Sequence, residues 1–166
     1  MYSRIMRILN EIDGRYPTEE EEREILEYAE SVPKRLQVAY LVQQREGECV
    51  AETVEEMKRR YSRFAPLHDR AWEKATRDMQ LCLRYMTQAM LVDDLQMPVE
   101  KLYVWLGTII KGLGMTTQFS RDAYTILRDR LRLRLPANCF PLLEPHFNKL
   151  IEEMSTFIEP SRPAIE

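Results

Sequence analysis

The sequence predicts an all-α protein, a bundle of packed helices. Apolar residues recur at spacings of three and four wherever a pattern is sustained, which is the signature of amphipathic helices. Glycine is sparse, with five in 166 residues, and the 31% of charged and 45% of hydrophobic residues fit a charge-rich helical protein. A chain of this length forms one domain with a real core, and we expect about seven or eight helices.

The first predicted helix is a short N-terminal arm. Its apolar residues return every three or four positions, so they form one face, and Asp13-Gly14 then ends the helix. An apolar face on so short a helix must be covered by something else. The residues of this face are Ile5, Ile8, Leu9 and Ile12.

A longer helical region follows the arm and continues to about residue 61. Thr18 and Glu21 have the spacing of a capping box, which predicts a helix start at this point. Pro33 should kink or restart the helix, because proline has no backbone N–H to donate. Gly47 interrupts the apolar pattern further along, so we expect two helices to meet near it.

The central part of the chain predicts a long helix and a second, more apolar one. Asp69 can cap a helix over residues 70–92, and Asp93-Asp94 then closes it. Pro98 suits the first turn of the next helix, which should end near Gly112. We expect that helix to bury one face, formed by Leu102, Trp105, Leu106, Ile109 and Ile110.

Two more helices are predicted before a flexible tail. The first covers residues 119–135 and the second residues 142–154, and residues 156–166 should form the tail. Arginine and leucine alternate over residues 128–135, as they would in a strand, but this segment continues a helical pattern. We interpret its arginines as flanking a buried leucine stripe rather than binding nucleic acid.

Composition excludes several classes of protein. The net charge of −3 argues against nucleic acid or an anionic membrane as the main partner. No run of 18 apolar residues and no secretory signal is present, so we expect a cytoplasmic protein without membrane insertion. Three widely spaced cysteines and two histidines predict reduced thiols and no metal site.

Three charged residues within residues 74–78 form the most informative motif. Lys74, Arg77 and Asp78 stand at i, i+3 and i+4, so a helix brings their charged groups to one patch. Cations bind acids, and a carboxylate accepts from N–H donors. The patch therefore suits a ligand with both groups, although an ordinary solvated helix face would carry the same residues.

The segment K-A-T-R-D-M-Q-L-C-L-R-Y-M, residues 74–86, resembles the chromophore helix of phycobiliproteins, the phycocyanin and allophycocyanin family. In that family a cysteine stands where this chain has Ala75. The segment D-G-R-Y-P-T, residues 13–18, with Glu20, is similar to the turn between the family's N-terminal arm and its body. The resemblance implies a globin-like domain over residues 1–155, including an arm of residues 1–17.

The resemblance also implies a way of pairing. Family members pair head to tail through an aspartate of the arm and an arginine of the chromophore helix, and Asp13 and Arg84 hold the matching places. With the apolar arm residues, these two would form a homodimer or heterodimer interface. Two unrelated surface charges are the alternative.

A linear tetrapyrrole, or bilin, is the ligand that the resemblance implies. Asp78 would then hold the pyrrole nitrogens, and Arg77 and Lys74 the propionates, while Trp72 would either stack on the pigment or anchor the helix in the core. Ala75 has no thiol, so we expect no covalent cofactor and at most a noncovalent bilin. Cys82 should be a buried core thiol, and Cys139 loosely resembles a second attachment cysteine of the family.

The function expected from these observations is that of a noncatalytic phycobilisome-family protein. It would associate with phycobiliproteins or other phycobilisome components, at the thylakoid surface, in antenna assembly, turnover or regulation. The first alternative is a noncovalent bilin carrier or sensor, and the second a stress-response signalling module on the same fold. An enzyme acting on a tetrapyrrole, with Asp78 as proton donor, ranks last.

Overall fold

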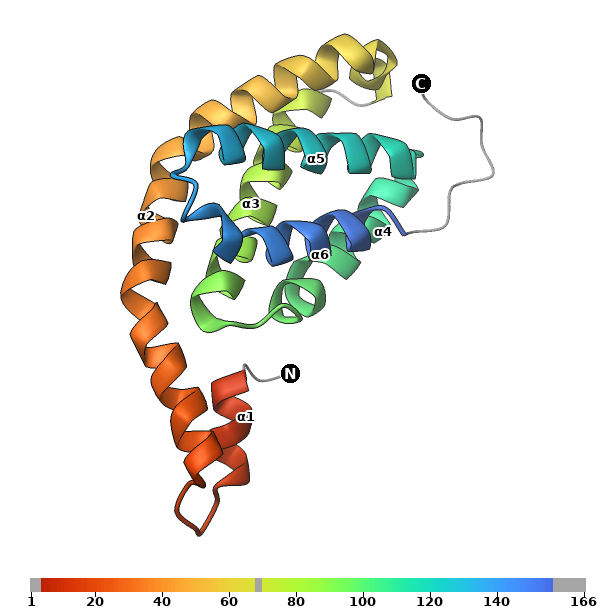
Figure 1. Ribbon diagram of the computed structural model, residues 1–166. Helices are drawn as coiled ribbons and strands as arrows, with labels where there is room; N and C mark the ends of the chain where they lie inside the picture. The colour runs from red at the N-terminus through yellow and green to blue at the C-terminus, as the bar shows by residue number, and fades with distance from the viewer. Residues whose placement is uncertain (1–3, 68–69, 157–166) are drawn as a thin grey trace.

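The computed structural model describes residues 4–67 and 70–156, and in these residues every regular element is a helix. Most of the helices pack together into one body, and an N-terminal hairpin projects from it (Figure 1). None of the described helices is long and apolar enough to cross a membrane. In chain order they are α1 (Arg4–Glu11), α2 (Glu19–Arg60), η1 (Ser62–Leu67), α3 (Ala71–Val92), η2 (Val99–Tyr103), α4 (Val104–Gly112), α5 (Thr117–Arg134), η3 (Phe140–Leu142) and α6 (Glu144–Met154).

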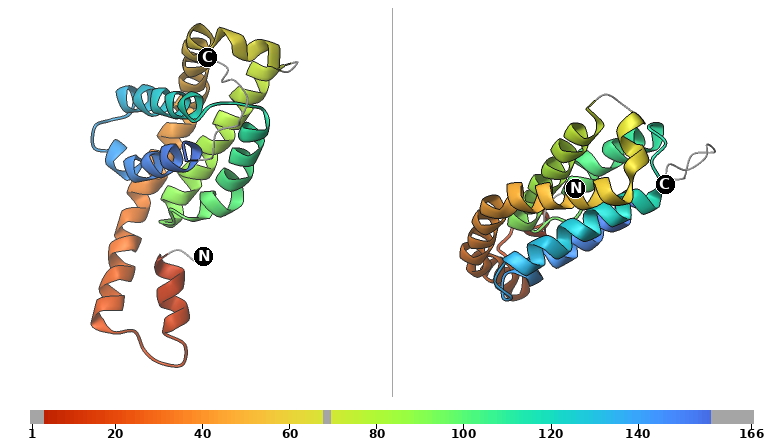
Figure 2. Two further views of the ribbon diagram at one scale, coloured as in Figure 1. Left: turned by 90° about the vertical axis from the view of Figure 1, so that its right-hand side faces the viewer. Right: turned by 90° about the horizontal axis from the view of Figure 1, so that it is seen from above.

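The predicted N-terminal helix is present as α1, and it packs as a hairpin against the first turns of α2. Ile8 is buried in this hairpin. The left view of Figure 2 shows the hairpin at one end of the molecule. The predicted capping box is present: the Thr18 hydroxyl accepts from the Glu21 N–H, and the Glu21 carboxylate accepts from the Thr18 N–H at 2.7 Å. Arg15 also pairs with Glu21 at 2.7 Å, and together these donors lower the pKa of Glu21 to about 2.

α2 is one curved, continuous helix of 42 residues, so a restart at Pro33 and the predicted boundary at Gly47 are wrong. Proline removes one backbone hydrogen bond, and glycine costs about 1 kcal/mol relative to alanine, so neither alone has to end a helix that is held by packing. Val38 and Val42 on one side of Gly47, and Cys49 and Val50 on the other, are all buried in the core. Gly47 itself lies on the exposed side.

An arginine fixes the first half of α2 to the body. Arg35 is buried, donates to Ser31 Oγ at 2.8 Å, and pairs with Asp93 at 2.9 Å. It also donates to the Met90 carbonyl and lies over the Tyr28 ring. We name Tyr28, Ser31, Arg35 and Asp93 the Arg35 cluster.

The body is built from α3, α5 and α6 packed against the second half of α2. α2 contacts both α3 and α5, and α5 contacts α6. The largest fully buried side chains are Tyr103, Phe147, Met57, Leu83, Met86, Met90, Leu106, Leu127, Leu131, Leu143, Leu150 and Met154. Four of these are methionines, whose flexible side chains fill irregular space in the core.

The ends of α3 and α4 lie where the sequence predicts them, while the predicted start of α3 cannot be compared with the structure. Asp93 ends α3 in the left-handed conformation at φ 55°, and its N–H donates to the Ala89 carbonyl. Pro98 precedes the helical stretch that continues into α4, and α4 ends at Gly112. The predicted cap Asp69 lies outside the described residues, and α3 starts at Ala71 with Arg70 also left-handed.

The buried face of α4 is narrower than predicted. Leu102, Leu106 and Ile110 are buried, but Trp105 is 57% exposed and Ile109 is also exposed. The reason is the position of α4: it packs against η2 and α6 and leaves the side that faces α3 partly open. One part of the predicted apolar face therefore packs in the core, and the other part, Trp105 and Ile109, lines a pocket.

The segment 128–135 is helical up to Arg134, which confirms that its alternation does not make a strand. Leu127, Leu131 and Leu135 are buried, and the arginines between them form ion pairs. Arg130 and Arg134 both pair with Glu52 of α2, and Arg132 pairs with Glu144 at 3.7 Å. These contacts use the arginines to join α5 to its neighbours.

Candidate functional site

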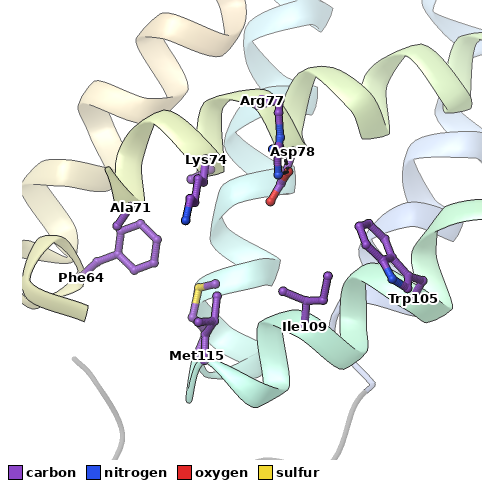
Figure 3. A pocket seen from close by; sticks show the side chains of 10 residues that line it. Phe64, Ala71, Lys74, Arg77, Asp78, Trp105, Ile109 and Met115 are labelled. Atoms are coloured by element: carbon purple, nitrogen blue, oxygen red, sulfur yellow. Dashed lines mark hydrogen bonds and ion pairs between the residues drawn. The ribbon is translucent and has the colours of Figure 1, made fainter. Parts of the chain in front are cut away.

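A pocket of about 360 Å³ opens between α3 and α4. Its walls are mostly apolar, and its polar groups come from one face of α3, as the sequence motif predicts. In Figure 3, Phe64 and Trp105 stand toward opposite ends of this pocket, and Lys74 and Asp78 point from α3 toward α4. The lining residues are Phe64, Ala71, Lys74, Ala75, Arg77, Asp78, Trp105, Ile109, Leu113 and Met115.

The charged residues of the pocket are already partly paired. Arg77 donates to Asp78 Oδ1 from Nε at 3.1 Å and from Nη2 at 2.9 Å. The Arg77 side chain is 70% exposed, while that of Asp78 is 23% exposed and so lies deeper in the pocket. The pair can therefore present a cation at the rim and a carboxylate oxygen further in.

The predicted ring-stacking residue Trp72 lies elsewhere. Its ring packs edge-on against Phe64 at 4.5 Å between centroids and lies 6.5 Å from Phe119, so it belongs to an aromatic cluster of the core. The tryptophan that does line the pocket is Trp105. The sequence carried a signal for it, because Trp105, Ile109 and Leu113 repeat every four residues, but this spacing is equally typical of a buried stripe.

The thiols are buried away from the pocket, whose lining includes no cysteine among the described residues. Cys82 Sγ lies 3.2 Å from the Tyr124 hydroxyl, and burial raises the pKa of this thiol to about 12. This confirms Cys82 as a core residue. Cys139 is also fully buried, which leaves it inaccessible as an attachment site in this conformation.

The predicted interface residues lie on two separate surfaces. Arg84 lines a groove of about 620 Å³ between α2 and α3, together with Leu36, Tyr40 and Glu46. There it pairs with Glu46 of its own chain at 2.6 Å. Asp13 is exposed in the turn after α1.

The four arm residues predicted to form one apolar face differ in how far they are buried. Ile8 is buried in the hairpin, and Ile5 and Ile12 are half-buried. Leu9 is 51% exposed, and Met6, which the sequence interpretation did not select, is exposed beside it. Leu9 is therefore the most exposed of the four residues that the sequence predicts for this face.

Comparison with protein families decides where the chain belongs. The family model described as Phycobilisome protein matches residues 9–154, which include the body and the part of the arm from Leu9 onward. The chain belongs to the phycobilisome protein family. A search of curated proteins found no match. Phycobilisome membership confirms the resemblance drawn from residues 74–86 and 13–18, agrees with the helical fold, and links the protein to the light-harvesting antenna.

Phycobilisome proteins normally carry covalent bilins and are generally noncatalytic. The pocket residues Lys74, Arg77 and Asp78 come together as the sequence predicts, with Ala75 in the wall. Their role toward a pigment stays a prediction, as does the pairing of Asp13 with Arg84.

Proposed function

We propose that this protein is a noncatalytic phycobilisome component that associates with a phycobiliprotein chain through its arm and through the α2–α3 groove. Association would take place where phycobilisomes are, in the cytoplasm at the thylakoid surface, and would serve antenna assembly, turnover or regulation. The observation that carries the proposal is a pair of uncovered apolar surfaces, one on the arm and one in the groove. The arm surface is centred on Leu9, and the groove surface consists of Leu36 and Tyr40.

These surfaces are unusual for an isolated chain. Leu36 is 56% and Tyr40 is 61% exposed, although both are large and apolar and lie side by side on one helix. Contiguous exposed apolar residues with a polar rim are typical of protein interaction sites. Glu46, Arg84 and Gln88 supply such a rim here.

The chain cannot cover its own groove with its arm. Ile8 ties α1 to the first turns of α2, and α2 continues into the groove without a hinge. α2 is continuous between the arm and the groove, so in this structure the arm stays packed on the first turns of α2. We therefore assign the cover of the groove to a partner chain.

The charge of the groove favours an acidic arm residue in the partner. Arg84 is 59% exposed in its side chain, while Glu46 below it is only 13% exposed. Glu46 therefore holds the guanidinium in place at the rim without hiding it. The partner's aspartate would share Arg84 with Glu46, and reciprocally Asp13 would meet an arginine of the partner.

Binding to purified phycocyanin and allophycocyanin tests this proposal. In sedimentation experiments followed at the pigment's visible absorbance, the full chain should co-sediment with one of them. Leu9→Asp and Arg84→Glu should each weaken binding by about tenfold or more, as expected of central interface residues. Leu133→Asp is the matched control, because Leu133 is 78% exposed on α5, and it should bind normally.

Two results would contradict the proposal. Absence of co-sedimentation with either protein would exclude direct association and leave the signalling alternative. Equal weakening by Leu9→Asp and Leu133→Asp would mean that association does not use the arm.

The α3–α4 pocket supports a second candidate function, noncovalent binding of a bilin. The specific observation is that Lys74, Arg77 and Asp78 line one apolar cavity, which fits a ligand with acids, N–H groups and flat rings. Added phycocyanobilin or biliverdin should then show a shifted and sharpened visible spectrum. No shift, or the same shift with Asp78→Ala, would reject this candidate.

A further inference from the structure

Helix α4 has an apolar side that the other described elements leave uncovered. Trp105, Ile109 and Leu113 follow one another at intervals of four residues, so they lie along one side of the helix, and all three are exposed. Val104, beside Trp105 in the chain, is 63% exposed. The helix rests on η2 and α6, which accounts for the exposure of its outer side. A group of large apolar side chains in this position is typical of a surface that another molecule covers.

This side of α4 borders a hollow that can receive a side chain. It forms one wall of the α3–α4 pocket, and the buried residues Phe64 and Met115 also line the pocket (Figure 3). Arg77 and Asp78 at the opposite wall pair with each other at 2.9 Å. In helix-in-groove complexes, a large apolar side chain of the bound helix enters a pocket of this kind. The α3–α4 pocket, of about 360 Å³, has room for such a side chain.

The exposed charges along α4 are positive. Residues 101–115 include two lysines and no acidic residue. Lys101 and Lys111 are exposed, and neither forms an ion pair with a residue that the structure describes. Glu100, directly before this stretch, already has an interaction partner, and Glu153, which lines the other side of α4, is paired within α6 at 2.6 Å. The two lysines therefore favour a partner with acidic groups.

The spacing of the lysines fits a helix better than a membrane. Lys101 and Lys111 are ten residues apart, which is about 15 Å along a helix. A second helix that lies along α4 meets both lysines if it has acidic residues ten or eleven positions apart on one face. An anionic bilayer fits less well, because the net charge of −3 opposes its approach and a flat surface does not enter the pocket.

We propose that α4 is a docking site for an acidic amphipathic helix of a partner protein. An apolar side chain of that helix enters the α3–α4 pocket beside Trp105, and its acidic residues pair with Lys101 and Lys111. The site goes beyond the association proposed above, because α4 lies across the body from the first half of α2, which carries the arm and one wall of the groove (Figure 1). A bilin in the same pocket would compete with the helix.

Two synthetic peptides test the proposal on the full chain. Both are amphipathic helices of about 18 residues, or five turns, with the same apolar face of leucine and phenylalanine. Their polar positions are glutamate in one peptide and lysine in the other. Fluorescence anisotropy of the labelled peptides should show that the acidic peptide binds at least about tenfold more tightly, because it gains two ion pairs that the basic peptide cannot form.

Reversal of the two charges should reverse this preference. The double variant Lys101→Glu with Lys111→Glu should weaken the acidic peptide by about tenfold or more and strengthen the basic one. The matched control is Lys34→Glu with Lys58→Glu, which changes the net charge equally but on α2. It should leave the affinity of the acidic peptide within about twofold, because distant exposed charges are screened by salt.

Replacement of the exposed tryptophan tests the apolar part of the site. Trp105→Ala should weaken both peptides alike, by about tenfold, because both use the same apolar face. Circular dichroism of every variant checks that the helical fold is kept. Leu9→Asp and Arg84→Glu leave α4 unchanged and should bind the acidic peptide normally, which separates this inference from the association proposed above.

Three results would overturn the proposal. The first is absence of binding of the acidic peptide up to about 1 mM. The second is equal binding of the two peptides, or equal weakening of the acidic peptide by the two charge-reversed proteins. The third is binding of the full chain to phosphatidylglycerol vesicles without binding of the acidic peptide, which would make α4 a membrane contact.

Discussion

Two arginine–aspartate pairs in this protein have the same chemistry and opposite surroundings. Arg35 and Asp93 lie 2.9 Å apart where α2 meets the end of α3, and Arg77 and Asp78 lie at the same distance in the α3–α4 pocket. The Arg35 side chain is 11% exposed and donates to two further acceptors, Ser31 Oγ and the Met90 carbonyl. The Arg77 side chain is 70% exposed and bonds only its neighbour Asp78 among the described residues. The first pair holds helices together. The second leaves its charges available to a ligand.

Replacement of Arg35 should have the largest effect on stability and so shows the difference between the two pairs most clearly. Arg35→Ala removes bonds to Ser31, Met90 and Asp93 in one step, and it leaves a buried carbonyl without its donor. We expect a loss of about 3 kcal/mol in the free energy of unfolding, because a buried hydrogen-bonded cation is lost. Urea denaturation followed by circular dichroism measures it. A loss of less than about 0.5 kcal/mol in the free energy of unfolding would mean that the Arg35–Asp93 pair contributes no more than an exposed ion pair.

The pH dependence of stability sharpens the same comparison through His146, a buried residue of α6 near the Arg35 cluster. Burial lowers the pKa of His146 to about 4, with Asp93 and Asp94 opposing and Arg35 adding to the shift. The unfolded chain binds a proton near pH 6.5 and the folded chain does not, so stability should fall as the pH drops from about 6.5 to about 4.

Between pH 8 and pH 5 this residue alone should cost about 2 kcal/mol. His146→Leu should be less sensitive to pH by that amount, measured as the difference between two series of urea denaturation curves. Glu21, whose pKa is lowered to about 2, loses its contribution at lower pH and does not interfere. Identical pH profiles for both proteins would mean that His146 is protonated in the folded state.

Replacement of Arg77 should have the smallest effect on stability. Arg77→Gln removes an exposed ion pair between adjacent residues, which contributes less than about 0.5 kcal/mol. Thermal unfolding should therefore be almost unchanged, in contrast to Arg35→Ala. A large loss would show that the pocket pair, too, supports the fold.

The sequence could predict local features of this molecule, because these depend on neighbours in the chain. The Thr18–Glu21 capping box, the end of α3 at Asp93 and the shared face of Lys74 and Asp78 all follow from spacings of a few residues. Contacts between distant segments could not be predicted in this way. Arg35 and Asp93 are 58 residues apart, so nothing in the local pattern of either residue indicated their pair.

The same limit explains the errors at α2 and α4. Pro33 and Gly47 weaken a helix locally, but burial of Val38, Val42, Cys49 and Val50 against other helices keeps α2 whole. For Trp105 the error is the opposite one, because the sequence predicted too much burial. Its apolar spacing indicated a core residue, but α4 packs against η2 and α6 and leaves Trp105 exposed at the pocket.

The unbroken course of α2 has a mechanical consequence. At 1.5 Å per residue its 42 residues follow a curved path about 63 Å long, with the Thr18 turn at one end and η1, which carries Phe64 of the pocket, at the other. If the arm holds a partner and the pocket holds a ligand, as proposed, this one helix would set the separation between the two.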